Sequence, residues 1–412
     1  RFRGPPPPPP LCSGCTPLVG ALRLVAAASP GFSWLWLVLR SCQGAAPDRG
    51  ARMAPRDWGS KKLRALDLRL LRGLAPEWQE EFCDEHSVEF MAKDGLPAQL
   101  QGLKPMHPFK EAVVVAILGF MFIVPPLVMS MPIVLYCFPV FGSALAGVML
   151  ISVLWPSRYW PTCQTGFLAS WILEYFSVVF VYPAGFNAED YHDKSGLLYT
   201  IPHAVMPVGS LLCHLVIERI FGFKAHGYAA SILFKMPFVR HFPIWMGSIP
   251  AEKKIIRKVL QKPREGSGGF LDGIAGMFEA REDAEVFYIG KRTGAFRLAL
   301  EHGSIMLAGF CCGAQEVMSA WYDGYGVLKG VSRTLRMSLL WPYGRWFLPI
   351  PRRVALILVY APPVECEQAD APTEEQVFDL RDRFLDAVQE SFDVGKQIYP
   401  GWEKRRLIIK TD

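Results

Sequence analysis

The chain has 412 residues, of which 51% are hydrophobic, 13% aromatic and 20% charged, and its formal net charge is +6. The charged share is below the roughly 25% of a typical soluble domain, and the mild, scattered positive charge excludes an evident nucleic-acid partner. The 10 cysteines are irregularly spaced, which argues against a disulfide framework and against a zinc site in the main body. This composition favours a protein that faces the cytosol and carries apolar segments.

The first 52 residues are atypical. They begin at Arg1, continue with a polyproline run after Gly4, and contain an apolar stretch broken by Arg23, Pro30 and Gly31. Low-complexity polyproline does not build a packed core, and the apolar stretch satisfies the pattern of a signal peptide only in part. The first methionine is Met53. We therefore expect residues 1–52 to be a disordered tail or a non-native leader outside the fold.

Residues 53–110 are predicted to form a basic amphipathic helix followed by a linker. The stretch "SKKLRALDLRLLRGL" at 60–74 places Leu63, Leu66 and Leu70 at helical spacing, with lysines and arginines over much of the remainder. Such a helix suits an anionic membrane surface, but it also suits packing against the protein itself. Residues 76–110 are mixed and polar, which is typical of a linker.

Residues 111–157 are predicted to form a membrane hairpin. No charged residue occurs from Ala112 to Ser157, and this run is long enough for two helices of about 20 residues each. Four prolines surround its middle, at positions 125, 126, 132 and 139. Backbone groups in lipid must pair within helices, so we expect helices at 112–132 and 136–155 joined by a tight turn. Basic residues on both flanks place both ends of the hairpin in the cytosol.

Residues 158–412 alternate between strand-like and helix-like segments. The predicted strands are short, rich in β-branched and aromatic residues, and lie at 177–185, 286–292, 304–312 and 353–364. Helical periodicity marks 252–262, 294–303 and 373–398, and the last opens with a capping box of Thr373 and Gln376. Residues 262–269 read as a flexible loop. The alternation predicts an α/β domain with a mostly parallel sheet flanked by helices.

An ordered series of motifs follows the hairpin. It comprises "YTIPHAVMPVG" from Tyr199, "FKMPFVRHFPIWMGSIPAEKKIIRKVL" from Phe234, "KRTGAFRLALEHGSIMLAGFCCGAQ" from Lys291, "FLPIPRRVALILVYAPPV" from Phe347, "PTEEQ" from Pro372 and "KRRLIIK" from Lys404. Over about residues 110–410 this series resembles the type-2 diacylglycerol acyltransferase family, which includes monoacylglycerol acyltransferases and wax synthases. Each motif is weak by itself, and their order carries the resemblance.

His203 is the candidate catalytic residue. Pro202 and His203 match the second half of the family's Tyr-x-x-His-Pro-His-Gly block, and Ala204 follows. The resemblance implies acyl transfer from a coenzyme A thioester to a lipid hydroxyl. An alcohol needs a base as it attacks, and histidine has a pKa suited to that task near neutral pH. A single histidine in an apolar run is also typical of an ordinary half-buried residue.

Other residues of the motifs are candidates for substrate binding. Gly209 suits an oxyanion site or a simple turn. Arg292 and Arg297, around Gly294, suit the phosphates of coenzyme A, although solvated surface charge is the alternative. By resemblance, Tyr182 and Pro183 correspond to a Tyr-Phe-Pro block and Gly273 to part of a Gly-Gly-x-x-Glu block. His302, before Gly303, reads as a helix C-cap residue.

Three departures from the family pattern concern the candidate catalytic residues, and Ala308 and Cys312 also replace a proline and a phenylalanine of a later block. Ile201 replaces the first histidine, Ala204 replaces a glycine, and the expected glutamate falls on Gly276. Either Asp272, in a register shifted to "GGFLD", or Glu279 would then have to orient His203.

These departures leave two functional hypotheses. In the first, the protein transfers acyl groups to diacylglycerol, or alternatively to monoacylglycerol or a fatty alcohol. In the second, it is a non-catalytic membrane protein that binds lipid or acyl-CoA. We expect acyl-CoA as co-substrate, a neutral lipid acceptor, and no cofactor or metal. We expect a multi-pass protein of the endoplasmic reticulum membrane with a cytosolic catalytic domain. Lipid-droplet association and a homo-oligomer are left open.

Overall fold

The computed structural model describes residues 61–411 except for 76, 78, 280–283, 322–326 and 336–339. The expectation for residues 1–52 lies outside this range. The described residues belong to one compact unit, Asp48–Asp412.

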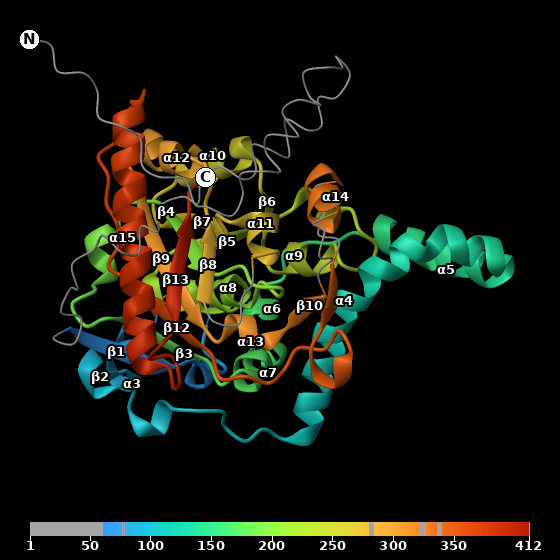
Figure 1. Ribbon diagram of the computed structural model, residues 1–412, viewed down its shortest axis with the longest axis horizontal. Coiled ribbons are helices and arrows are strands. Elements are labelled where there is room, and N and C mark those ends of the chain that lie inside the picture. Colours follow the sequence, from blue (N-terminus) through green and yellow to red (C-terminus); the bar gives the residue numbers. More distant parts are fainter. Residues whose placement is uncertain are drawn as a thin grey trace, which may run out of the picture. The chain divides into compact units, whose positions relative to one another are not determined.

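A nine-stranded sheet forms the centre of the molecule (Figure 1), in the order β2-β1-β3-β12-β9-β4-β7-β5-β6. In chain order its strands are β1 (Lys62–Asp67), β2 (Val88–Met91), β3 (Val179–Pro183), β4 (Gly196–Ile201), β5 (Lys224–Ala229), β6 (Ile249–Pro250), β7 (Glu265–Gly269), β9 (Ile305–Cys312) and β12 (Ile357–Tyr360). Most neighbouring strands of this sheet run parallel. The antiparallel pairs are β1 with β2, β1 with β3, and β12 with β9. The predicted mostly parallel α/β sheet is therefore confirmed.

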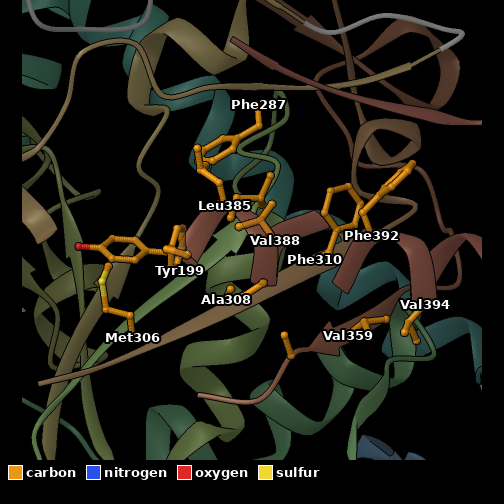
Figure 2. Packing of buried hydrophobic residues seen from close by; sticks show 14 of the residues in the cluster. Tyr199, Phe287, Met306, Ala308, Phe310, Val359, Leu385, Val388, Phe392 and Val394 are labelled. Atoms are coloured by element: carbon orange, nitrogen blue, oxygen red, sulfur yellow. The ribbon is translucent and has the colours of Figure 1, made fainter. Parts of the chain in front are cut away.

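Helices cover both faces of this sheet. One face packs against α10 (Lys253–Leu260), α12 (Gly294–His302) and α15 (Glu374–Ile398), and the other against α7 (Phe167–Tyr175) and α8 (Val208–Phe221). Successive residues of a strand point to opposite faces, so Tyr199 joins the first core and Leu198 the second. Figure 2 shows the first core, in which the rings of Phe310 from β9 and Phe392 from α15 lie 5.2 Å apart.

Shorter elements complete the described part. They are η3 (Leu68–Leu71), α3 (Glu80–His86), η4 (Ala92–Asp94), η5 (Ala98–Leu100), α6 (Thr162–Thr165), η6 (Ala188–Tyr191), η7 (Ser231–Phe234), α9 (His241–Trp245), α11 (Gly273–Met277), α13 (Ala314–Val317), α14 (Val327–Leu335) and η8 (Arg345–Phe347). Two small sheets pair β8 (Ala284–Tyr288) with β13 (Arg406–Lys410) and β10 (Ser319–Trp321) with β11 (Trp341–Tyr343). The four predicted strands and three predicted helices of the body all form, and Thr373 and Gln376 make the capping box.

The predicted amphipathic helix at 60–74 is wrong. This segment forms β1 and η3, and β1 lies between β2 and β3. Leu63 and Ala65 enter one core and Leu66 enters the other, so the apolar residues serve two faces of a strand. The linker prediction for 76–110 is also incomplete, because α3 and the edge strand β2 lie within it.

The predicted loop at 262–269 is instead β7, which lies between β4 and β5. Its glycines allow a close approach to β4. A Cβ at Gly268 would lie 2.3 Å from the carbonyl oxygen of Leu198, and one at Gly266 would lie 2.8 Å from that of Gly196. The glycine run therefore permits tight strand packing, whereas the sequence pattern suggested flexibility.

The uncharged segment forms two helices, but they meet later than predicted. Helix α4 (Pro108–Cys137) continues through Pro125, Pro126 and Pro132, breaks at Phe138, and is followed by α5 (Pro139–Leu154). The expected turn near 132–136 is thus wrong, because a proline removes one helical hydrogen bond and bends a helix without having to end it. Among the described helices, α4 is long and apolar enough to cross a membrane, and α5 is shorter.

The two halves of α4 have different surroundings. Val114 and Leu118, in the first half, are buried in the same core as α7 and α8. Beyond Pro126 many large apolar side chains of α4 and α5 are exposed. Both helices also contact residues 236–238 of the body. Val124 of α4 packs against Met236, and Ser152 Oγ of α5 accepts a hydrogen bond from the backbone N–H of Phe238 at 2.8 Å.

Candidate active site

His203 lies just beyond the carboxyl end of β4. The neighbours of β4 are β9 and β7, and both run parallel to it. In α/β sheets, ligands bind outside the carboxyl ends of parallel strands, where loops and helix starts converge. His203 is therefore at the edge of the sheet where a catalytic group is expected.

One hydrogen bond determines the protonation pattern of the His203 ring. Nδ1 lies 2.9 Å from the carbonyl oxygen of Ala204. Because a carbonyl oxygen can only accept, Nδ1 carries a proton and donates a hydrogen bond to that oxygen. The Nε2 lone pair is then available to accept a proton. The ring is half-buried and lies against Phe270, with ring centroids 4.4 Å apart. The sequence pattern does not distinguish Phe270 from other apolar residues. Its ring forms an apolar wall beside the imidazole of His203.

Asp272 is the carboxylate that the structure brings to His203. It is fully buried, and its Oδ2 accepts a hydrogen bond from the backbone N–H of His203 at 3.2 Å. Its Oδ1 is also buried and has no hydrogen-bond partner among the described residues. Burial raises the pKa of Asp272, while the nearby charges of His203 and Arg292 act in the opposite direction.

Gly276 makes room for this carboxylate. A Cβ at Gly276 would lie 2.0 Å from Oδ2 of Asp272, so a side chain at 276 and the carboxylate of Asp272 would occupy the same space. The resemblance places a glutamate at 276. In this chain the carboxylate comes instead from Asp272, one helical turn earlier. A glycine at 276 is required to leave space for it.

Glu279, the other candidate carboxylate, has a different partner. Lys410 Nζ in β13 lies 2.6 Å from Glu279 Oε2, and the ion pair joins the segment that follows α11 to the small β8–β13 sheet. The structure therefore brings Asp272 and not Glu279 to the backbone of His203.

The residues next to His203 are tightly constrained. Pro202 and Ala204 are buried, and Ala204 has a φ of 53°, in the left-handed region that favours glycine. Gly209 lies in the first turn of α8. A Cβ there would lie 2.8 Å from both Cys311 Cβ and Thr200 Cγ2, so this glycine lets α8 pack closely on the sheet.

The candidate arginines have local partners. Arg292 is exposed and donates from Nη1 to the carbonyl oxygen of Tyr288 at 2.9 Å. Arg297 pairs with Glu374 at 2.6 Å, which ties α12 to the start of α15. Gly294 begins α12 and has open space around it, and Gly273 begins α11 with a φ of 49°.

Tyr182 and Pro183 are not brought to His203. They end β3, which is separated from β4 by β12 and β9 and runs antiparallel to β4. Tyr182 is buried in a core, and Pro183 lines a separate cavity of about 230 Å³ beside Tyr360.

His302 also lies away from His203, at the opposite edge of the sheet. It lines a cavity of about 1170 Å³ together with Ser195, which directly precedes β4. Its Nδ1 is 3.0 Å from the carbonyl oxygen of Leu298, and Gly303 closes the helix in the left-handed conformation. These contacts fit its interpretation as a helix-end residue.

Comparison with known proteins identifies the family. The family model for diacylglycerol acyltransferase matches residues 156–410. The mouse protein 2-acylglycerol O-acyltransferase 1 is 23% identical over 61% of this chain and 79% of its own length. Diacylglycerol O-acyltransferase 2B of Umbelopsis ramanniana is 22% identical over 48% of this chain and 62% of its own. Human acyl-CoA wax alcohol acyltransferase 1 is 24% identical over 50% and 68%. The chain therefore belongs to the diacylglycerol acyltransferase family and is a divergent acyltransferase of neutral-lipid synthesis.

Proposed function

We propose that the protein transfers an acyl group from acyl-CoA to the hydroxyl of diacylglycerol, with His203 as general base. The observation that carries this proposal is the Nδ1 hydrogen bond to the Ala204 carbonyl, which leaves Nε2 as the basic nitrogen. The acceptor hydroxyl attacks the thioester carbonyl while its proton passes to Nε2. The tetrahedral intermediate then expels the coenzyme A thiolate, which takes the proton from Nε2 and restores the neutral imidazole.

Asp272 acts in this proposal as a positioning residue. Its hydrogen bond to the His203 backbone holds the residue at the end of β4. A negative charge there also stabilises the imidazolium that forms during attack. The second carboxylate oxygen, buried without a partner among the described residues, is available for a further hydrogen bond.

The names of the relatives suggest different acceptors. The three relatives described above are named for 2-acylglycerol, diacylglycerol and wax alcohol. Monoacylglycerol is the second candidate acceptor for this chain, because the mouse relative, which aligns over 79% of its length, is named for it. No cofactor enters the proposed reaction, and acyl-CoA is a co-substrate.

The apolar pair α4–α5 is proposed as the membrane anchor in the endoplasmic reticulum. Its exposed side chains beyond Pro126 are large and apolar, among them Ile133, Tyr136, Phe141 and Leu154. A soluble protein rarely exposes so continuous an apolar surface. Lys110 and Arg158 flank the pair, and by the positive-inside rule these charges support the proposal that both ends and the catalytic body face the cytosol.

The test is an acyl-transfer assay in membranes from a host that lacks its own neutral-lipid acyltransferases. The full chain is expressed and given labelled acyl-CoA with diacylglycerol, monoacylglycerol and fatty alcohol in parallel. We expect labelled triacylglycerol, and its loss in His203→Ala. His302→Ala, at the opposite edge of the sheet, is the matched control and should retain activity. Equal product from the His203→Ala variant would remove His203 from the chemistry, and a product from another acceptor would reassign the substrate.

A further inference from the structure

We propose that a second apolar surface, separate from α4–α5, inserts into the interfacial layer of a phospholipid bilayer. This surface is the aromatic loop, defined as residues 341–348, together with Trp321. The inference rests on the proposed membrane attachment and adds to it a second point of contact on the catalytic body.

The aromatic loop exposes its largest side chains. The exposed fractions are 62% for Trp341, 66% for Trp346, 84% for Phe347 and 50% for Leu348. Trp321, which is 71% exposed, lies directly across from Trp341 in the β10–β11 pair. Scattered apolar residues on a surface need no explanation, but several large ones gathered on one hairpin and its adjoining loop mark an interaction site.

The backbone of the loop holds these side chains outward. Trp346 and Phe347 both have positive φ, 54° and 59°, a conformation that costs about 1 kcal/mol or more for such residues. Two hydrogen bonds fix it, from the N–H of Gly344 to the Leu348 carbonyl at 2.7 Å and from the N–H of Arg345 to the Ile350 carbonyl at 2.8 Å. The loop therefore holds both rings exposed in a strained backbone conformation.

The loop is fixed to the proposed anchor helix. Arg345 pairs with Glu111 in the first turn of α4 at 2.5 Å. Further along α4, the position of a Cβ on Gly119 would lie 3.5 Å from Ile350 Cγ1. Figure 1 shows β10 beside α4, in agreement with these contacts. The aromatic loop therefore lies against the first half of the one described helix long and apolar enough to cross a membrane.

The charge around the loop suits a phospholipid headgroup layer. No acidic residue occurs between Leu340 and Arg353. Of the three arginines in this stretch, Arg345 and Arg353 both pair with Glu111. Arg352 donates hydrogen bonds to Ser319 Oγ and to the Glu316 carbonyl oxygen and has no carboxylate partner among the described residues, so it is the cation available to a phosphate. The Arg345 guanidinium is 4.6 Å from the Trp346 ring, and that of Arg352 is 5.7 Å from the Tyr343 ring. Tryptophans with arginines behind them are typical of the membrane–water interface, where the rings meet the acyl boundary and the cations meet phosphate. This composition favours a lipid layer over a protein partner.

The test measures the depth of the loop in vesicles. The full chain, with cysteines 12, 15, 42, 137, 163 and 366 replaced by serine so that the native cysteines left are buried, carries Phe347→Cys labelled with an environment-sensitive fluorophore. It is reconstituted into phosphatidylcholine–phosphatidylserine vesicles that contain lipids spin-labelled near the headgroup or deep in the acyl chain. We expect at least a twofold rise in emission over detergent-free buffer, and stronger quenching by the shallow label than by the deep one. Gln368→Cys, an exposed residue that lines the cavity near His302, is the matched control and should show neither effect.

Two further measurements separate this inference from the membrane anchor. Native Cys137, exposed at the end of α4, is labelled in a protein in which cysteines 12, 15, 42, 163 and 366 are replaced by serine. Quenching at Cys137 without quenching at position 347 would overturn the inference and leave the anchor in place. A response at 347 in cell membranes but not in pure lipid vesicles would assign the loop to a protein partner and would also overturn it. Acyl transfer is assayed on the same preparations, so a failure of the proposed activity is read independently.

Discussion

The two groups that hold His203 act at different points of the residue. Asp272 accepts a hydrogen bond from its backbone N–H, and the Ala204 carbonyl accepts one from its Nδ1. The carboxylate therefore fixes where the histidine lies, while the carbonyl fixes which nitrogen is basic. Variants of the two groups should have separable effects.

Asp272→Asn is predicted to lower kcat by about 10- to 100-fold, with KM for acyl-CoA within about twofold. The amide oxygen can still accept the His203 N–H, but the charge that favours the imidazolium is lost. Steady-state kinetics of the native protein and the variant measure both constants. Glu279→Gln, which breaks an ion pair with Lys410, is the control, and an unchanged kcat in Asp272→Asn would exclude the electrostatic role.

Gly276→Ala is predicted to reduce activity at least as much as Asp272→Asn. The added methyl group would overlap Asp272 Oδ2, which lies 2.0 Å from the position of that carbon, and would displace the carboxylate. The double variant Asp272→Gly with Gly276→Glu, which moves the acid back to 276, should recover part of the loss. If the double variant is no better than Gly276→Ala alone, the two positions are not alternatives for one carboxylate.

Ala204→Gly is predicted to stabilise the protein by about 0.5–1 kcal/mol. An alanine in the left-handed conformation costs about 1–2 kcal/mol, which the glycine variant does not carry. Glycine has more conformational freedom in the unfolded chain, and this reduces the gain in stability by about 0.4–1 kcal/mol. Denaturant unfolding in detergent measures the change. Ala387→Gly, in the interior of α15, should instead destabilise by about 1 kcal/mol. A destabilised Ala204→Gly would show that the methyl group contributes packing that outweighs the strain.

At the scale of elements, the sequence pattern predicts a helix or strand correctly where local residues determine it, as in a helix with one buried face or a strand of consecutive apolar residues. Helix α15 has a capping box and a buried stripe, and both were visible in the sequence. Strands β1 and β7 were missed because their assignment depends on neighbours far along the chain. The Leu63–Leu70 spacing fits a helix as well as a strand, and a glycine run reads as a loop until another strand is known to lie against it.

Gly268→Ala is therefore predicted to destabilise the protein by about 3 kcal/mol or more. Its Cβ would lie 2.3 Å from the Leu198 carbonyl oxygen in β4, and neither backbone can move without disturbing the sheet. Gly185→Ala, where a Cβ would meet nothing within 4 Å, is the matched control and should change stability by less than about 0.5 kcal/mol. Thermal or urea unfolding of both variants provides the comparison, and a mild effect at 268 would mean that β4 and β7 separate readily.

At the scale of the whole molecule, fold class and family could be predicted from the sequence, because strands, helices and motifs follow one another in a characteristic order. The position of the candidate site could be predicted only in part. His203 follows a buried strand and belongs to a motif, but the choice of Asp272 over Glu279 depends on how α11 packs. The distance of Tyr182 from His203 depends on strand order and direction, which local pattern does not contain.

The contribution of His214 to global stability should fall in acid. This histidine is buried in α8, where the Gly227 N–H donates to its Nδ1 at 3.1 Å and its Nε2 is 2.7 Å from the Met246 carbonyl oxygen. Burial lowers its pKa to about 4. Below about pH 6.5 the unfolded chain binds a proton that the folded protein binds only near pH 4, so stability is lost across that window, about 2 kcal/mol by pH 5.

The measurement is the difference in unfolding free energy between the native protein and His214→Gln. The comparison is needed because burial raises the pKa of Glu285 to about 7, and this group changes stability in the opposite direction as pH falls. Between pH 7 and pH 5 the advantage of the native protein over the variant should shrink by about 2 kcal/mol. A difference that stays constant over this range would show that His214 does not titrate there.

Helix α4 belongs to two parts of the molecule at once. Its first half is buried with Val114 and Leu118 in the core of the catalytic body, and its second half lies in the exposed apolar pair. Where α4 is the proposed anchor, a change in the tilt of its second half would be passed through the first half to the catalytic body and would reorient the carboxyl edge of the sheet relative to the lipid surface. A thinner bilayer tilts an anchored helix differently from a thicker one. The turnover rate of this enzyme would then depend on bilayer thickness, through mechanics alone and without a lipid touching His203.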